Sequence, residues 1–182
     1  MDQPHIELAN KLLLEMKKEH HVVNQGVVSD FKEFDGLRLK VIIKIKEILS
    51  NFFNEGINVD KFKTDIDSIN KQNPLWGFRG ANGQMFFNML TNSSIDKGEL
   101  ARALRKTLIA PSDIKEAKEH INSLIEFIKT NTKEHEDKRK SPRIKSVLYF
   151  LSYFWQIQEP EKYPVFYNSL EQTFLELGFL TD

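Results

Sequence analysis

The sequence predicts an all-α protein, an irregular single-domain bundle of about eight helices. Apolar residues recur at spacings of three and four along most of the chain, which is the pattern of amphipathic helices. No segment alternates convincingly between apolar and polar residues, as a half-buried strand would. A chain of 182 residues can bury about 70% of its unfolded surface in one core. We therefore expect one domain over residues 1–182.

Two helices are predicted in the first third of the chain. Residues 4–20 carry apolar side chains on one helical face: Ile6, Ala9, Leu12, Leu13 and Met16. The next helix runs from Asp30 to about Asn54, with Ser29 or Asp30 as its cap and Gly56 at its end. Its apolar face comprises Phe31, Phe34, Leu37, Val41, Ile45, Ile48, Leu49 and Phe52.

Four further helices are predicted in the middle of the chain. A short one contains Val59, Phe62, Ile66 and Ile69 and ends before Asn73-Pro74, because proline disfavours helical geometry in the preceding residue. After a glycine-rich loop near 74–84, another begins with Met85, Phe86, Met89 and Leu90. One more contains Leu100, Ala103, Leu104 and Leu108 and stops near Pro111. A long helix, capped by Ser112 or Asp113, contains Ile114, Ala117, Ile121, Leu124, Ile125 and Ile128.

The C-terminal third contains a connection and two helices. Residues 130–143 lose the apolar pattern and predict an exposed connection. The run VLYFLSYFWQI (147–157) has β-branched and aromatic residues that allow a strand, but its length favours a buried helix. Leu170, Phe174, Leu175 and Leu177 predict a last helix before Gly178.

Composition excludes several classes of function. The absence of cysteine excludes disulfides, thiolate metal sites and cysteine nucleophiles, and is typical of a reducing compartment. No apolar run approaches the 18 residues of a membrane span, and the start resembles no signal peptide, so we expect a cytoplasmic protein with no membrane partner. Basic and acidic residues balance at 26 each, so any nucleic-acid contact must be local.

The loop NPLWGFRGANGQ (73–84) is the first candidate site. It matches neither the P-loop nor the GxGxxG pattern, so it does not predict nucleotide binding. Its glycines can form a tight structural corner. Alternatively they bring backbone amides close to a ligand, with Arg79 as a bidentate donor, Asn82 and Gln84 as polar readers, and Trp76 or Phe78 as a stacking face.

The basic run KRKSPRIK (138–145) is the second candidate. Lys138, Arg139, Lys140 and Arg143 can follow a nucleic-acid backbone or dock an acidic partner, although a solvated connector has the same composition.

The third candidate is the aromatic cluster around Trp155. Aromatic residues at helical spacing usually build a core, but Trp155 could also stack on an exposed base. No histidine or carboxylate pattern predicts a metal site or a catalytic centre. We therefore expect no enzyme and no cofactor.

Two segments and the helix between them resemble a known family. LWGFRGANGQMFFNML (75–90) and VLYFLSYFWQIQEPEKYPVFYNSL (147–170) are similar to N-terminal regions of McrB-type AAA+ restriction proteins, over roughly residues 70–170. The resemblance implies a module that recognises DNA, often with modified cytosine. It also implies an AAA+ motor domain in the same longer chain and a separate nuclease subunit as partners. Neither a Walker motif nor a nuclease signature occurs here, and several modules of that family are β-rich or mixed.

Two functions follow as hypotheses. The first is a non-catalytic DNA-binding module of an antiviral restriction system. The second is a protein–protein interaction or assembly module of a defence protein, because aromatic residues and arginine anchor interfaces.

Overall fold

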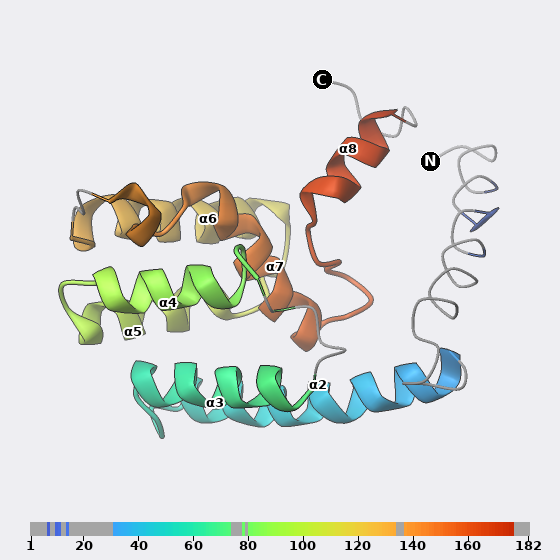
Figure 1. Ribbon diagram of the computed structural model, residues 1–182, viewed down its shortest axis with the longest axis horizontal. Coiled ribbons are helices and arrows are strands. Elements are labelled where there is room, and N and C mark those ends of the chain that lie inside the picture. The colour runs from blue at the N-terminus through green and yellow to red at the C-terminus, as the bar shows by residue number, and fades with distance from the viewer. Residues whose placement is uncertain are drawn as a thin grey trace. The chain divides into compact units, whose positions relative to one another are not determined.

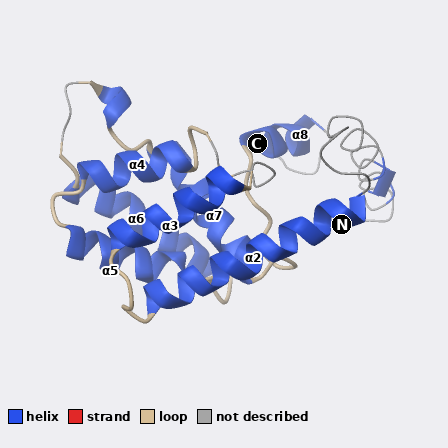
Figure 2. Cartoon of the chain, turned by 60° about the horizontal axis from the view of Figure 1, so that its bottom comes forward, coloured by secondary structure: helices blue, strands red, loops and turns tan. Residues whose placement is uncertain are grey.

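The computed structural model describes residues 7, 10, 11, 14, 31–73, 78, 80–133 and 137–176, without the side chains of 31–35, 138 and 168–171. The chain divides into two compact units, one of residues 42–168 and the other of residues 1–41 with 169–182. We describe each unit by itself, and the prediction of a single domain stays a prediction. All regular structure in the described residues is helical (Figure 2).

The larger unit contains the C-terminal part of α2 (Phe31–Phe53) and the whole of α3 (Val59–Gln72). Helix α2 ends in a turn in which the Gly56 amide donates to the carbonyl of Asn51, at 2.9 Å. The side chain of Asn58 caps α3 by accepting from the amide of Lys61, which satisfies one of the free donors of the first turn. The phenyl rings of Phe52 and Phe62 then stack at 4.3 Å and join the two helices.

Three helices follow, α4 (Gln84–Ser93), α5 (Lys97–Leu108) and α6 (Ile114–Asn131) (Figure 1). Asp96 caps α5 and Asp113 caps α6 through their carboxylates. Helices α5 and α6 pack against each other as a hairpin, and α3 contacts both α4 and α5. The two ends of the hairpin are joined by an isolated bridge between Ser94 and Thr132.

Two 3₁₀ turns, η1 (Lys138–Lys140) and η2 (Ile144–Ser146), lead into α7 (Val147–Gln158). Helix α7 is buried along most of its length and contacts α5 and α6, as its continuous apolar sequence requires. In the smaller unit, α8 (Asn168–Glu176) ends the described chain, although its first residue belongs to the larger one.

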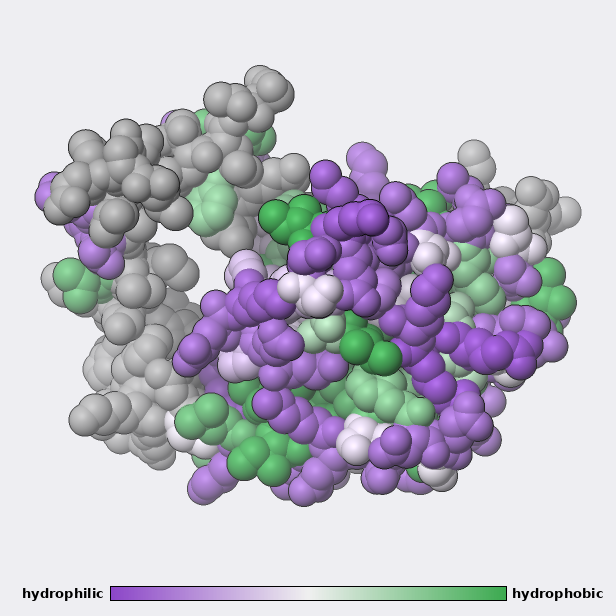
Figure 3. Space-filling view, turned by 180° about the vertical axis from the view of Figure 1, so that it is seen from behind, coloured by the Kyte–Doolittle hydropathy of each residue, from purple (hydrophilic) through white to green (hydrophobic). Residues whose placement is uncertain are grey.

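Phenylalanine dominates the core of the larger unit. Phe150 of α7 contacts Phe86 and Phe87 of α4, with ring centroids 5.0 and 5.3 Å apart. The ring of Phe154 lies 5.8 Å from that of Phe62, so α7 joins α3 and α4. Rings at these separations in tilted or edge arrangements gain energy beyond their buried area. Hydrophilic side chains predominate on the face of Figure 3, where hydrophobic ones gather in separate small groups.

Arg105 of α5 closes the end of α2. Its Nε donates to the carbonyl of Phe52 at 2.8 Å, and its Nη2 donates to that of Ile57 at 3.4 Å. The guanidinium lies over the Phe52 ring, 4.8 Å from its centre. The planar cation therefore binds one carbonyl in the last turn of α2 and one just beyond the helix, and packs on an aromatic face as well.

The all-α prediction is confirmed for the described residues, and the helix over 147–157 is confirmed against the strand alternative. Asp113, one of the two predicted caps, caps α6. The described residues contain seven α-helices, and the expected total of about eight stays a prediction. Of the helix predicted over 4–20, only residues 7, 10, 11 and 14 are described, and residues 74–77 and 79 of the loop near 74–84 lie outside the described residues.

Candidate nucleic-acid interface

Two glycines before α4 have structural reasons of their own. Gly80 has φ 118°, a conformation that residues with a Cβ rarely adopt. At Gly83, a Cβ would lie 2.2 Å from the carbonyl oxygen of Phe78. Phe78 is fully buried, and its carbonyl accepts the amide of Gln84 at 2.9 Å. This part of the loop therefore forms the tight corner that starts α4, while Trp76, Gly77 and Arg79 lie outside the described residues.

The two polar residues predicted in this loop lie at the start of α4. Asn82 is half-buried, and its Oδ1 accepts the hydroxyl of Ser146 at 2.8 Å. Gln84 is the first residue of the helix and is also half-buried. Ser146 directly follows the basic run, so this hydrogen bond brings two of the predicted sites together.

The basic run, residues 138–145, hereafter the basic segment, lies along α4. At its start, the hydroxyl of Ser93 in the last turn of α4 donates to the carbonyl of Lys140 at 3.3 Å. Beyond its other end, Ser146 contacts Asn82 just before α4. The segment therefore runs antiparallel to the helix.

The cations of the basic segment are exposed. Arg139 is 86% exposed at its side chain and pairs with Asp137 at 3.0 Å. Lys140, Arg143 and Lys145 are exposed and form no ion pair with any described residue. Lys138 lies in η1, and its side chain is outside the description.

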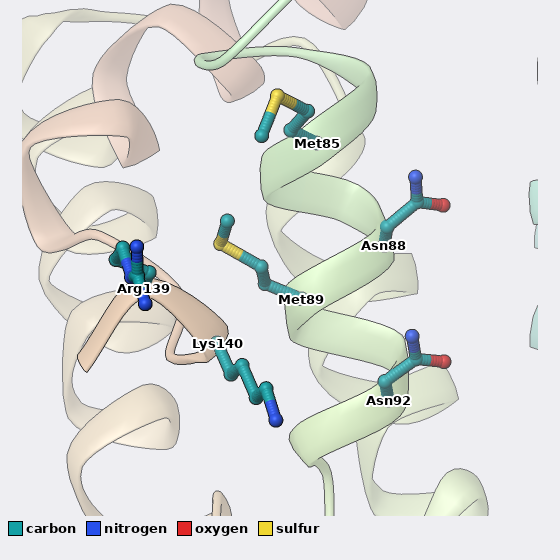
Figure 4. Close-up of a pocket in the computed structure, with 6 residues that line it drawn as sticks. All are labelled: Met85, Asn88, Met89, Asn92, Arg139 and Lys140. Atoms are coloured by element: carbon teal, nitrogen blue, oxygen red, sulfur yellow. The ribbon is translucent and has the colours of Figure 1, made fainter. Parts of the chain in front are cut away.

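A hollow of about 330 Å³ separates the basic segment from α4. In Figure 4, Met85 and Met89 point across it toward Arg139 and Lys140. Asn88 and Asn92 project from an adjacent face of the helix in a common direction (Figure 4). The hollow thus combines thioethers, amides and two cations.

The four apolar residues that predicted the start of α4 lie on two different faces of the helix. Met85 is 48% exposed and Met89 is half-buried. Phe86 and Leu90 fill the core instead. Hydrophobicity alone does not separate the two faces, because methionine suits both a core and an interface.

The position of Trp155 corrects the sequence interpretation. It is only 3% exposed, and its Nε1 donates to the carbonyl of Thr107 at 3.0 Å. A ring in this position offers no face to a base, so the stacking role expected of Trp155 is wrong for this structure. The buried indole holds α7 against the end of α5 and satisfies its polar atom there.

The remaining titratable groups do not assemble a reactive site. Within the described residues, no three histidines or carboxylates come close enough to hold a metal ion. Burial lowers the pKa of His120, opposed by the Glu116 carboxylate 3.7 Å from its Nε2. Among the described helices, none is both long and apolar enough to cross a membrane.

Comparison of the chain with protein-family models, with curated proteins and with solved structures finds no match.

Sequence reasoning missed Asn88 and Asn92. A signal was present, because Gln84, Asn88 and Asn92 are spaced by four and α4 contains no charged residue. This pattern points to a binding site only because the basic segment lies beside α4. The sequence does not show that contact, because the segment is more than 40 positions further along the chain.

Proposed function

We propose that the chain is a non-catalytic DNA-recognition module, as the resemblance to McrB-type restriction proteins implies. The observation that carries the proposal is the position of the basic segment along α4. Cations that can contact phosphates lie beside uncharged polar residues that can contact bases, which is the division of roles in sequence-reading proteins. An AAA+ motor in the same longer chain and a separate nuclease subunit belong to this proposal.

Phosphate contacts predict a definite salt dependence. Each neutralised phosphate contributes about −0.9 to the slope of log affinity against log salt. Lys140, Arg143 and Lys145 together predict a slope of about −2.7, or about a fortyfold loss of affinity between ~50 and ~200 mM salt.

The test is fluorescence anisotropy of the chain with labelled duplexes, unmodified and containing 5-methylcytosine, and with a single strand. Lys140→Glu with Arg143→Glu is expected to weaken binding to every duplex. Lys115→Glu with Lys118→Glu, at two exposed lysines of α6, is the control for the change in charge. Absence of binding to all three probes at low salt, with the helical circular dichroism spectrum intact, would refute the proposal.

Arg79 keeps its role as a proposed base reader. Arg79→Ala is expected to weaken binding to the preferred duplex and to leave the other duplexes unaffected. An equal loss on every duplex would identify Arg79 as a phosphate contact instead.

The hollow beside α4 favours a second candidate, a protein interaction or assembly module. Exposed methionine is typical of adaptable protein interfaces, and Met85 is 48% exposed at the hollow. Analytical ultracentrifugation over a range of concentrations tests self-assembly. Association that Met85→Lys abolishes would support this candidate.

A further inference from the structure

The accessible face of α4 differs from the outer faces of its neighbours. Five residues form it, and none is charged: Gln84, Met85, Asn88, Met89 and Asn92. By contrast, α5 exposes Lys97, Glu99, Arg102 and Lys106, and α6 exposes Lys115, Lys118, Glu119, Glu126 and Lys129. Depletion of charge with retention of methionine is characteristic of the centre of an interface.

The charges at the edge of this face indicate the partner. Lys140 lines the hollow beside Met89, and Arg143 follows it along the basic segment, so the uncharged face is flanked by cations. A helix with cations along one side fits a polyanion in which the groups that the helix recognises lie between rows of negative charge. Duplex DNA has this arrangement, because base edges lie in a groove between two phosphate backbones.

The side chains on this face of α4 suit A·T base pairs. Asparagine and glutamine form paired hydrogen bonds with the N6 and N7 atoms of adenine, and apolar groups contact the methyl group of thymine. The face of α4 presents amides at Asn88 and Asn92 beside thioethers at Met85 and Met89 (Figure 4). It carries no arginine or lysine for guanine and no carboxylate for cytosine.

The spacing is also consistent with a groove. Residues four apart on a helix are separated by about 6 Å along its axis. Successive base pairs are separated by about 3.4 Å. Asn88 and Asn92 therefore match positions about two base pairs apart.

We infer that α4 is the reading helix of this module and that Asn88 and Asn92, with Met85 and Met89 beside them, select A·T base pairs in the major groove. The inference rests on the proposed DNA-binding function and specifies the sequence class that this function recognises. The basic segment supplies the phosphate contacts that hold α4 in register.

The test compares an A·T-rich duplex with a G·C-rich duplex of equal length at one salt concentration, by anisotropy with the whole chain. We expect the A·T-rich duplex to bind at least tenfold more tightly. Asn92→Ala, or Asn88→Ala, is expected to reduce that affinity about five- to hundredfold and to leave the G·C-rich duplex unaffected.

Asn122→Ala is the matched control, because Asn122 is an exposed asparagine within α6 and alanine favours a helix equally at both sites. Replacing thymine by uracil removes the methyl group, and the wild type is expected to lose affinity. That loss is expected to disappear when Met85 and Met89 are both replaced by alanine.

The outcomes separate the inference from the function on which it rests. Equal binding of the two duplexes, or an equal loss on both from Asn92→Ala, would overturn base reading by α4 and leave DNA binding standing. Absence of binding to both duplexes and to a single strand at low salt would overturn both. If Lys140→Glu abolishes DNA binding and no substitution on α4 changes the affinity, the site is limited to the basic segment and the inference is refuted.

Discussion

Replacing Gly83 by alanine is expected to destabilise the protein through a single contact. The added methyl group would lie 2.2 Å from the carbonyl oxygen of Phe78 and 3.0 Å from its ring atom Cδ2. Phe78 cannot easily move away, because its ring packs against that of Tyr153, with centroids 4.3 Å apart, and its carbonyl accepts the amide of Gln84.

The magnitude follows from these two restraints. Overpacking a closely packed site costs about 1–3 kcal/mol. Loss or distortion of the hydrogen bond from Gln84 adds about 0.5–1.5 kcal/mol. The free energy of unfolding is therefore expected to fall by about 1.5–4.5 kcal/mol, which lowers the Tm of a chain of this size by about 3–18 °C.

Thermal unfolding followed by far-UV circular dichroism measures this change. Gly36→Ala is the control, since Gly36 lies within α2 and its added Cβ would meet nothing within 4 Å. There the same substitution is expected to stabilise by about 1 kcal/mol through helix propensity. A Tm of Gly83→Ala equal to that of the wild type would refute the close approach of Gly83 to Phe78.

Three further changes test the packing of the larger unit. Trp155→Phe leaves the carbonyl of Thr107 without its indole donor, and urea denaturation is expected to show a loss of about 1–3 kcal/mol. Arg105→Lys retains the charge but not the planar fork over Phe52, so a loss of about 1–2 kcal/mol in the same assay is expected, and no loss would contradict the capping role. Burial lowers the pKa of His120 from 6.5, so its stabilising contribution is complete above pH 6.5 and is lost as the pH falls below that value. Urea denaturation over a pH series is expected to show a steeper fall for the wild type than for His120→Phe, and parallel curves would contradict this expectation.

Local patterns predicted most of the helices of the larger unit. The helix expected from Asp30 to about Asn54 is α2, Phe31–Phe53, because its apolar spacing persists for many turns. The cap of α6 was predictable because Asp113 immediately precedes the periodic pattern, and an aspartate there satisfies free amides. Such signals depend only on residues that are close together in the sequence, so they can be recognised without a structure.

The site was less predictable because it depends on neighbours in space. The basic segment and α4 could each be found in the sequence, but not their antiparallel contact through Ser93 and Ser146. The stacking role of Trp155 was wrong for a related reason. Aromatic residues at helical spacing usually build a core but can also stack on a base, and only the contact with Thr107 shows that this indole is buried.

The bridge between Ser94 and Thr132 holds the start of α5 beside the end of α6. The amide of Ile95 donates to the carbonyl of Asn131 at 3.0 Å, and that of Lys133 donates to the carbonyl of Ser93 at 2.8 Å. The opposite end of the hairpin is attached to α7, because Trp155 donates to the carbonyl of Thr107 and Gln158 donates to that of Leu108. Both ends of the hairpin are therefore fixed, and evolution or design could change the length of α5 or α6 only by breaking one of these attachments.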